Sequence, residues 1–158
     1  MAGDGHVNTM KSDVVTYEIF EFVEFQVGNS NFGLGIQHVR EIIQPVPVTV
    51  LPHAHPFIEG IIQLRGEVLP VIDLRKVTGN TDLNATKESK YIVAEFDGTT
   101  VVLDVTSVTQ IQRINFTDIE PASDMYMGDK VPVSGVIKRD NGMTLLVDFE
   151  KVIAEQFK

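Results

Sequence analysis

The 158-residue chain contains neither cysteine nor tryptophan. Without cysteine the protein forms no disulfide and offers no thiol for catalysis, which fits a reducing compartment such as the cytoplasm. Positive charge is scarce, because 13 Lys and Arg residues stand against 22 Asp and Glu residues, giving a net charge of −9. No basic run is available to neutralise phosphates. The composition therefore argues against nucleic acid, including a small-barrel oligonucleotide binder, and against anionic lipid.

Long apolar segments are also absent. No apolar run approaches the roughly 20 residues that are needed to cross a bilayer, so we expect no direct membrane insertion. Residues 1–12 lack the apolar region of a signal peptide. We interpret residues 1–15 as a disordered lead-in and residues 16–158 as the folded part, whose length allows one large domain or two small lobes.

A β-hairpin is predicted in the middle of the chain. Two apolar runs, Ile61–Leu64 and Val68–Leu74, flank the polar triplet Arg65-Gly66-Glu67. Short β-branched runs around a glycine-containing connection are typical of hairpins. Both arms are more apolar than is typical of a strand with one solvent-exposed face, so the hairpin is expected in a hydrophobic core. Pro70 lacks an N–H and is expected at an edge or a bulge. Arg65 would then emerge at the hairpin tip.

The second half of the chain repeats the pattern of the first half. A hairpin pattern around the turn at 28–31 recurs around Asp97-Gly98, and residues 60–77 match residues 135–152 in their glycine, apolar and Asp positions. We interpret this as an internal duplication. Its units span 17–78 and 90–153, and the polar segment 79–89 forms a linker between them.

The duplication predicts an all-β fold with two small barrels that share a hydrophobic core, because each unit alone buries little surface. Asp73 and Asp148 occupy equivalent places and are expected to cap short helices, the second at the C-terminus. We also expect eight equivalent hairpin residues to be buried: Ile61, Leu64, Val71, Ile72, Val136, Ile137, Leu146 and Val147.

Candidate chemistry is sparse. His53 and His55 are the only concentrated pair of metal ligands, and Glu59 could add an oxygen. Zinc usually needs three fixed protein ligands, so we interpret the pair as surface loop residues, and a small β-barrel metal-binding or enzymatic module that uses them stands as the alternative function. No nucleophile elbow or phosphate-binding glycine loop is present. We therefore expect no catalytic residue, metal or cofactor.

The central hairpin also carries a family resemblance. The pattern Gly60, Leu64-Arg65-Gly66, Pro70-Val71 and Asp73-Leu74, preceded by Val39-Arg40-Glu41-Ile42, resembles the CheW-like coupling family of bacterial chemotaxis. The resemblance extends over residues 21–157 and implies two five-stranded β-barrel lobes. Residues 39–66 are most similar to the N-terminal module of CheV-type scaffolds, where a CheW-like domain precedes a receiver domain. The chain itself does not separate a free-standing adaptor from such a module.

The resemblance implies an adaptor that couples chemoreceptors (methyl-accepting chemotaxis proteins) to the histidine kinase CheA in the cytoplasm, without catalysis of its own. Expected partners are the regulatory domain of the kinase, which shares the fold, and the helical tip of the receptor, docked in the groove between the lobes. An arginine on a rigid tip is a good anchor for carboxylates. The partner-binding positions carried over from the family are Val39, Glu41, Gly60, Arg65 and Gly66.

Overall fold

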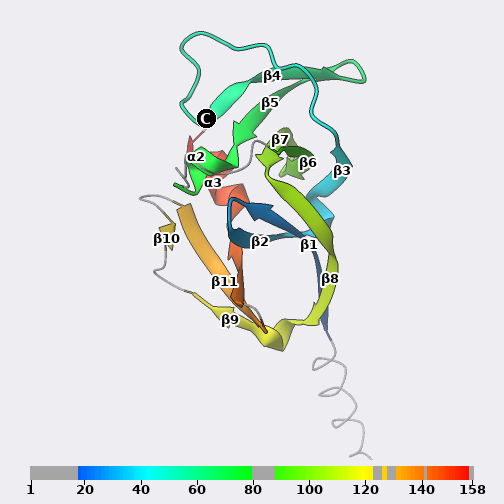
Figure 1. The fold of residues 1–158 in the computed structure, drawn as a ribbon, viewed down its shortest axis with the longest axis vertical. Helices are drawn as coiled ribbons and strands as arrows, with labels where there is room; N and C mark the ends of the chain where they lie inside the picture. Colours follow the sequence, from blue (N-terminus) through cyan, green and yellow to red (C-terminus); the bar gives the residue numbers. More distant parts are fainter. Residues whose placement is uncertain (1–17, 80–87, 123–125, 128–130, 141, 157–158) are drawn as a thin grey trace, which may run out of the picture.

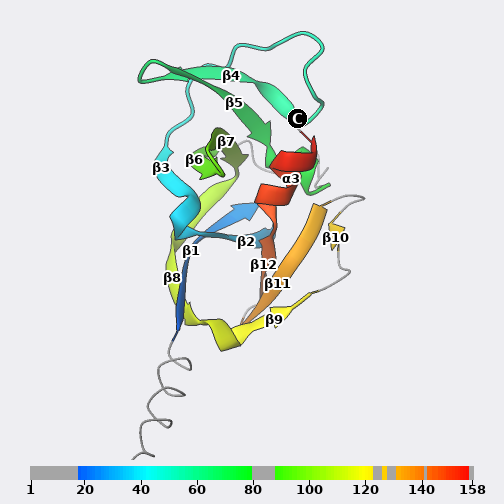
Figure 2. The same ribbon diagram turned by 180° about the vertical axis from the view of Figure 1, so that it is seen from behind.

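The computed structural model describes residues 18–79, 88–122, 126–127, 131–140 and 142–156. The expected lead-in over 1–15 and most of the expected linker over 79–89 lie outside these residues. Two β-sheets lie one above the other in Figure 1. Seen from behind, in Figure 2, the C-terminal helix lies between them.

The first repeat unit supplies five strands, one 3-10 turn and one helix. They are β1 (Ile19–Val27), β2 (Ser30–Gly35), η1 (Ile36–His38), β3 (Val39–Ile43), β4 (Ile58–Leu64), β5 (Glu67–Asp73) and α2 (Leu74–Val77).

The second unit repeats this order with additions after its third strand. Its elements are β6 (Lys90–Phe96), β7 (Thr99–Val105), β8 (Ser107–Asn115), η2 (Phe116–Asp118), β9 (Ile119–Pro121), β10 (Tyr126–Met127), β11 (Val131–Arg139), β12 (Gly142–Val147) and α3 (Phe149–Gln156).

Strand pairing confirms the duplication. One sheet has the order β3-β6-β7-β5-β4, and the other contains β8-β1-β2-β12-β11, with β9 and β10 added beside β11. In both sheets the third and fourth strands of this order pair in parallel, and all the other pairs are antiparallel. Equivalent bulges precede Gly60 in β4 and Gly135 in β11. Each lobe is thus an incomplete five-stranded barrel, because β3 and β4 at the ends of the first order do not pair with each other.

The lobes do not coincide with the repeat units 17–78 and 90–153. The hairpin β1–β2 of the first unit lies in the sheet built by β8, β11 and β12 of the second unit, and the hairpin β6–β7 lies with β3, β4 and β5. This exchange corrects the simple expectation of one unit per barrel. Its physical basis is that the parallel pairs β2–β12 and β5–β7 join strands far apart in the chain, which only a long crossover connection allows.

A shared hydrophobic core joins the two sheets, as expected. It contains residues from β1 and β2, from β6 and β7, and from both helices. The duplicated hairpins β4–β5 and β11–β12 contribute less to it than we expected, with Ile72 and Val147 as their fully buried members. The main contributors are Phe25, Phe32, Leu34, Leu74, Val77, Ile92, Phe96, Leu103, Phe149 and Val152.

The β4–β5 hairpin is only partly buried. Val71 and Ile72 are buried, whereas Ile61 and Leu64 are half-buried and Val68 is 61% exposed. The alternation of the strands turns Ile62, Leu69 and Val71 inward, so near the tip the opposite face, which carries Val68, meets solvent despite its apolar composition. In the second hairpin Ile137, Leu146 and Val147 are buried and Val136 is half-buried.

Both predicted caps are present. Asp73 Oδ1 accepts a hydrogen bond from Arg75 N at the start of α2, and Asp148 Oδ1 accepts one from Lys151 N at the start of α3. Each cap satisfies an N–H that has no partner inside its helix. Equivalent aspartates therefore start the closing helices of both units in the same way.

Candidate partner-binding site at the hairpin tip

The tip of the β4–β5 hairpin is a two-residue turn, Arg65-Gly66. Both residues have positive φ, 49° and 83°, which is the pattern of a type I′ turn. The turn between β6 and β7, Asp97-Gly98, has nearly the same values, 50° and 83°. Asp and Asn tolerate the left-handed region, whereas a long side chain such as arginine is uncommon there. Arg65 therefore occupies a backbone position that its residue type does not favour.

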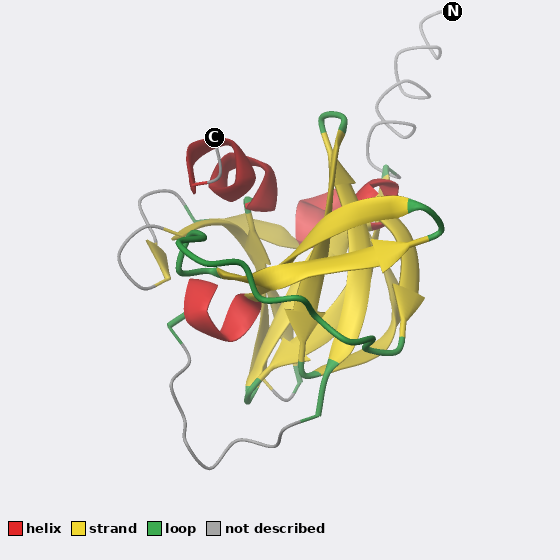
Figure 3. Ribbon diagram, turned by 90° about the horizontal axis from the view of Figure 1, so that it is seen from above, coloured by secondary structure: helices red, strands yellow, loops and turns green. Residues whose placement is uncertain are grey.

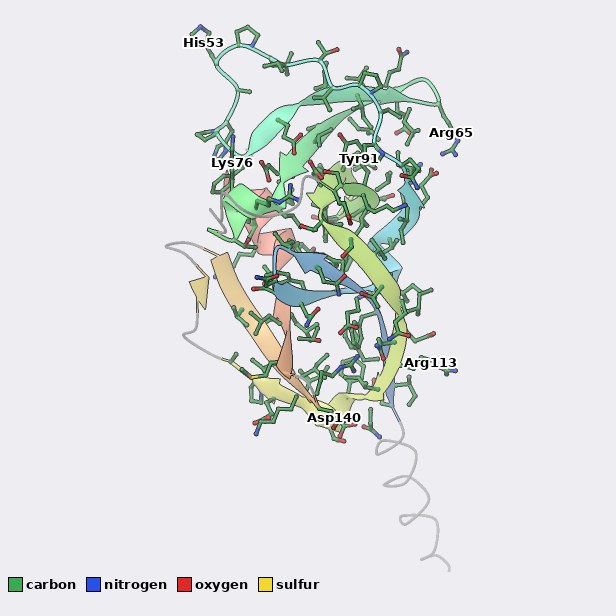
Figure 4. The ribbon with its side chains drawn as sticks, viewed as in Figure 1. His53, Arg65, Lys76, Tyr91, Arg113 and Asp140 are labelled. Carbon is green, nitrogen blue, oxygen red and sulfur yellow. The ribbon has the colours of Figure 1, made fainter. Side chains whose placement is uncertain are left out.

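Arg65 lies at the tip of the hairpin, as predicted, and its side chain is 69% exposed (Figure 4). Its Nη1 donates to Glu41 Oε2 on β3, at the far edge of the same sheet. This hydrogen bond is the main cause that lowers the pKa of Glu41, and the same bond raises the pKa of Arg65. Two residues that the resemblance marked separately thus form one ion pair.

A second ion pair lies beside the first and was not anticipated. Arg40 Nη2 donates to Glu67 Oε1 at 3.4 Å, and Arg40 Nη1 donates to Thr100 Oγ1 at 3.1 Å. The signal in the sequence was that Arg precedes Glu in both segments, at 40–41 and at 65–67, so the Arg of each segment can pair with the Glu of the other. We call Arg40, Glu41, Arg65, Glu67 and the exposed Val68 the hairpin-tip surface.

Gly60 lies elsewhere and has a structural role. A Cβ on this residue would lie 2.2 Å from Thr49 O, so only glycine lets the chain cross here. Thr49 and Ile61 exchange two backbone hydrogen bonds of 2.9 Å, which tie residues 46–51, hereafter the strap, to β4. Figure 3 shows this loop running alongside the hairpin. A shallow groove of about 330 Å³ lies between them, lined in part by Val46, Pro47 and Val68.

Val39 and Gly66 complete the set of candidate residues. Val39 begins β3, is half-buried and packs against the shared core. A Cβ added to Gly66 would meet no atom within 4 Å, so its positive φ, and not crowding, favours glycine. Three of the candidate residues therefore lie together at the tip, namely Glu41, Arg65 and Gly66. Val39 packs β3 against the shared core, and Gly60 lies where the strap is hydrogen-bonded to β4.

A second hollow lies where α3 meets the five-stranded sheet. This cavity of about 520 Å³ has apolar walls that include Ile58, Ile72 and Ile153, and its rim carries Asp97 and Glu150. A smaller cavity of about 250 Å³ shares Phe96 and Glu150 with it and continues onto the other sheet. We call the larger, mainly apolar hollow the groove at the lobe junction.

The histidine pair gives no support to the alternative function. His53 is exposed on the loop before β4, at the opposite end of the hairpin from Arg65 (Figure 4). The Nδ1 of His55 accepts a hydrogen bond from Phe57 N at 3.1 Å. Among the described residues, no three His, Cys, Asp or Glu side chains are grouped so that they could hold a metal ion. None of the helices in the described ranges is long and apolar enough to cross a membrane.

The structure defines a class of mainly β protein built on a duplicated two-sheet scaffold, and comparison with known proteins gives its family. Residues 21–157 match the family model of the CheW-like domain. The chain belongs to the CheW-like domain family, which confirms the resemblance read from its hairpin.

Individual relatives agree with this assignment. The chain is 32% identical to the chemotaxis protein CheW of Rhizobium meliloti, over 86% of this chain and 88% of that protein. It is 29% identical to the chemotaxis protein CheV3 of Helicobacter pylori, of which it spans 47%. A crystal structure of the scaffolding protein TtCheW from Thermoanaerobacter tengcongensis superposes with a TM-score of 0.79 at 32% identity, covering 89% of this chain and 97% of that one.

Proposed function

We propose that this chain is a non-catalytic adaptor of bacterial chemotaxis that couples chemoreceptors to the histidine kinase CheA. The observation that carries the proposal is the match of residues 21–157 to the CheW-like domain, together with relatives named as chemotaxis and scaffolding proteins. The adaptor would work in the cytoplasm, held at receptor arrays through its partners.

The hairpin-tip surface is the proposed anchor for a partner's carboxylate. Arg65 presents a planar group with several donors, and its backbone is fixed by the turn, so little freedom is lost on binding. Glu41 holds the guanidinium in place in the free protein and would release or share it in the complex. Val68 and the groove beside the strap add apolar area next to the charge.

The groove at the lobe junction is the proposed seat of the receptor's helical tip. Its apolar walls fit the apolar stripe of a helix, and the carboxylates of Asp97 and Glu150 at the rim suit basic residues that flank such a stripe. The regulatory domain of the kinase would instead meet the hairpin-bearing lobe. The charged hairpin tip and the apolar groove are therefore two separate surfaces, the first for the kinase and the second for the receptor.

Reversing the charge of Arg65 tests the anchor. In Arg65→Glu the donor is lost and a second carboxylate faces Glu41, so we expect affinity for the kinase regulatory domain to fall at least about tenfold, while affinity for the receptor tip changes little. The melting temperature should change little, because an exposed charge contributes little to stability. Isothermal titration calorimetry against each partner and thermal melts measure the two effects.

Arg113→Glu is the matched control. Arg113 is 70% exposed and also pairs with a glutamate, Glu21, at 3.7 Å, but it lies on β8 in the other sheet. We expect this variant to bind within about twofold of the unmodified chain. Equal affinities for all three proteins would refute the anchor, and a large loss of melting temperature in Arg65→Glu alone would make Arg65 a structural residue.

A further inference from the structure

Two carboxyl groups meet inside the five-stranded sheet, at the end remote from the hairpin tip. Glu59 is the extra residue of the bulge in β4, because Ile58 pairs with Ile72 while Gly60 pairs with Val71. Asp104 lies near the end of β7 and is 6% exposed. The side chains of Glu59 and Asp104 are within hydrogen-bonding reach of each other.

One oxygen of this pair lacks a donor when both groups are ionised. Asp104 Oδ1 is buried and receives no hydrogen bond from any other group in the described part of the chain. Two carboxylates only accept, so they cannot satisfy each other without a proton. A buried acceptor without a partner is costly, and a protonated Glu59 is a donor already in place.

The groups around the pair do not remove the need for a proton. Asp73 faces it from β5 and adds negative charge, while its own Oδ1 caps α2. Tyr91 on β6 and Lys76 on α2 also act on the pair, and both lie below the hairpin in Figure 4. Lys76 opposes the effect of the acids, but its influence is the weakest of those acting on Glu59.

The electrostatic consequence agrees with this geometry. Burial, followed by the hydrogen bond and the charge of Asp104, raises the pKa of Glu59 to about 8. Burial is also the main cause that raises the pKa of Tyr91 to about 12, so its hydroxyl stays neutral.

We propose that Glu59 keeps its proton at neutral pH and donates it to Asp104, forming a proton-sharing pair that locks the bulge of β4 and makes the lobe sensitive to pH. The lock acts next to Gly60, where the strap is tied to β4 through Thr49 and Ile61. Loss of the proton leaves three carboxylates, Glu59, Asp73 and Asp104, at one end of the sheet. The inference concerns the fold and does not depend on the adaptor function.

The direction of the pH effect follows from linkage. The folded protein holds a proton on Glu59 that the unfolded chain releases above a pKa of about 4.5. Stability from this group is therefore fully present below about pH 4.5 and is lost as pH rises through about 8. The window covers neutral pH, so a modest rise above neutrality loosens the bulge.

The direct test is a carbon-13 NMR titration of glutamate side-chain carboxyls in the unmodified protein, with the Glu59 signal assigned by its loss in Glu59→Gln. We expect a midpoint near 8 for Glu59, and a midpoint at least about one unit lower in Asp104→Asn. A Glu59 midpoint close to the ordinary value of 4.5 in the unmodified protein would overturn the proposal.

Thermal melts from mildly acidic to mildly alkaline pH give an independent readout. Glu59→Gln retains a donor for Asp104 but cannot ionise, so its melting temperature should fall less over this range than that of the unmodified chain. Glu95→Gln, which changes an exposed glutamate of β6, is the control and should follow the unmodified chain. Parallel pH profiles for all three proteins would contradict a proton-sharing pair.

Discussion

Glu24 on β1 and Val93 on β6 occupy equivalent places in the two sheets. Leu146 of β12 pairs with Gly33, and Gly33 pairs with Glu24. In the other sheet Val71 of β5 pairs with Val102, and Val102 pairs with Val93. The same path across three strands thus ends on a buried carboxylate in one lobe and on a buried apolar side chain in the other, with exposures of 7% and 1%.

The side chains that contact Glu24 are polar, whereas those that pack with Val93 are apolar. Glu24 Oε2 accepts hydrogen bonds from Thr144 Oγ1 at 2.8 Å and from Arg139 Nη2 at 3.3 Å, and its Oε1 accepts one from Gln112 Nε2 at 3.2 Å. The places of Thr144 and Arg139 are taken in the other lobe by Leu69 and Leu64, which pack with Val93. Around these two equivalent places, one interior is a hydrogen-bonded network and the other is an apolar cluster.

The comparison shows that interior chemistry does not specify this fold. Both lobes keep the strand order, the bulge before a glycine and the aspartate cap, although their interiors share few side-chain types. The lobe that contains Val93 also carries the turn at Arg65, where φ is 49°. Each interior must, however, be internally consistent, because a buried charge needs all of its partners.

The largest effect is expected from placing the charge of one lobe into the other. Val93→Glu buries a carboxylate among the apolar side chains of Leu69, Val71 and Val102, which offer no donor, so we expect a loss of more than about 4 kcal/mol in the free energy of unfolding. Urea denaturation followed by circular dichroism measures it. Val93→Ile, which changes volume without charge, should cost less than about 1.5 kcal/mol.

A Val93→Glu protein that unfolds at nearly the urea concentration of the unmodified chain would break the comparison. It would mean that the two interiors are interchangeable residue by residue, and that the hydrogen bonds to Glu24 are incidental.

The reverse exchange should be milder. Glu24→Val leaves the buried hydroxyl of Thr144 and the guanidinium of Arg139 without their acceptor, so we expect a loss of about 3 kcal/mol. The triple change Glu24→Val, Thr144→Leu and Arg139→Leu copies the apolar lobe. It should recover most of that loss, because replacing every member of a buried ion pair by apolar groups is often neutral or stabilising. Urea denaturation of both variants tests the difference.

Additive losses in the triple variant would show that the two lobes differ in shape as well as chemistry. Gly33, for example, stands where the other lobe has Val102, and a Cβ there would lie 2.8 Å from Leu146 Cδ2.

Much of the fold could be predicted from local pattern. The hairpins, the duplication, the caps at Asp73 and Asp148 and the exposed tip at Arg65 all follow from short stretches of sequence. The exchange of strands between the units could not be predicted, because strand partners are set by contacts between distant segments. The burial of Glu24 had a signal, since Phe20, Phe22 and Glu24 alternate along one strand face.

For the candidate site, the sequence suggests individual residues but not their arrangement, and their binding role stays a prediction. Glu41 and Arg65 were marked separately, and their pairing depends on β3 and the hairpin tip meeting across the lobe. Gly60 was marked as a binding residue, whereas its crowding against Thr49 O supplies a structural reason for the glycine. Such crowding comes from a loop 11 residues earlier in the chain and leaves no trace in the local motif.

The smallest effect concerns the two type I′ turns, Arg65-Gly66 and Asp97-Gly98. Asparagine suits the left-handed position better than arginine, so Arg65→Asn should raise the melting temperature by about 1–4 °C. Asp97→Arg should lower it by a similar amount, because it places a long side chain at the equivalent φ of 50°. Differential scanning calorimetry at neutral pH resolves changes of this size.

The ion pair with Glu41 must be separated from the turn itself, so the comparison is repeated in a Glu41→Gln background. There the charge partner is already absent, and the gain from Arg65→Asn reports the backbone alone. If the gain disappears in that background, Arg65 is not strained and the two turns differ only in their ion pairs. If it persists while the same variant binds its partners more weakly, arginine at this position costs stability and serves binding. That pairing of outcomes links the strained φ of 49° directly to the proposed anchor.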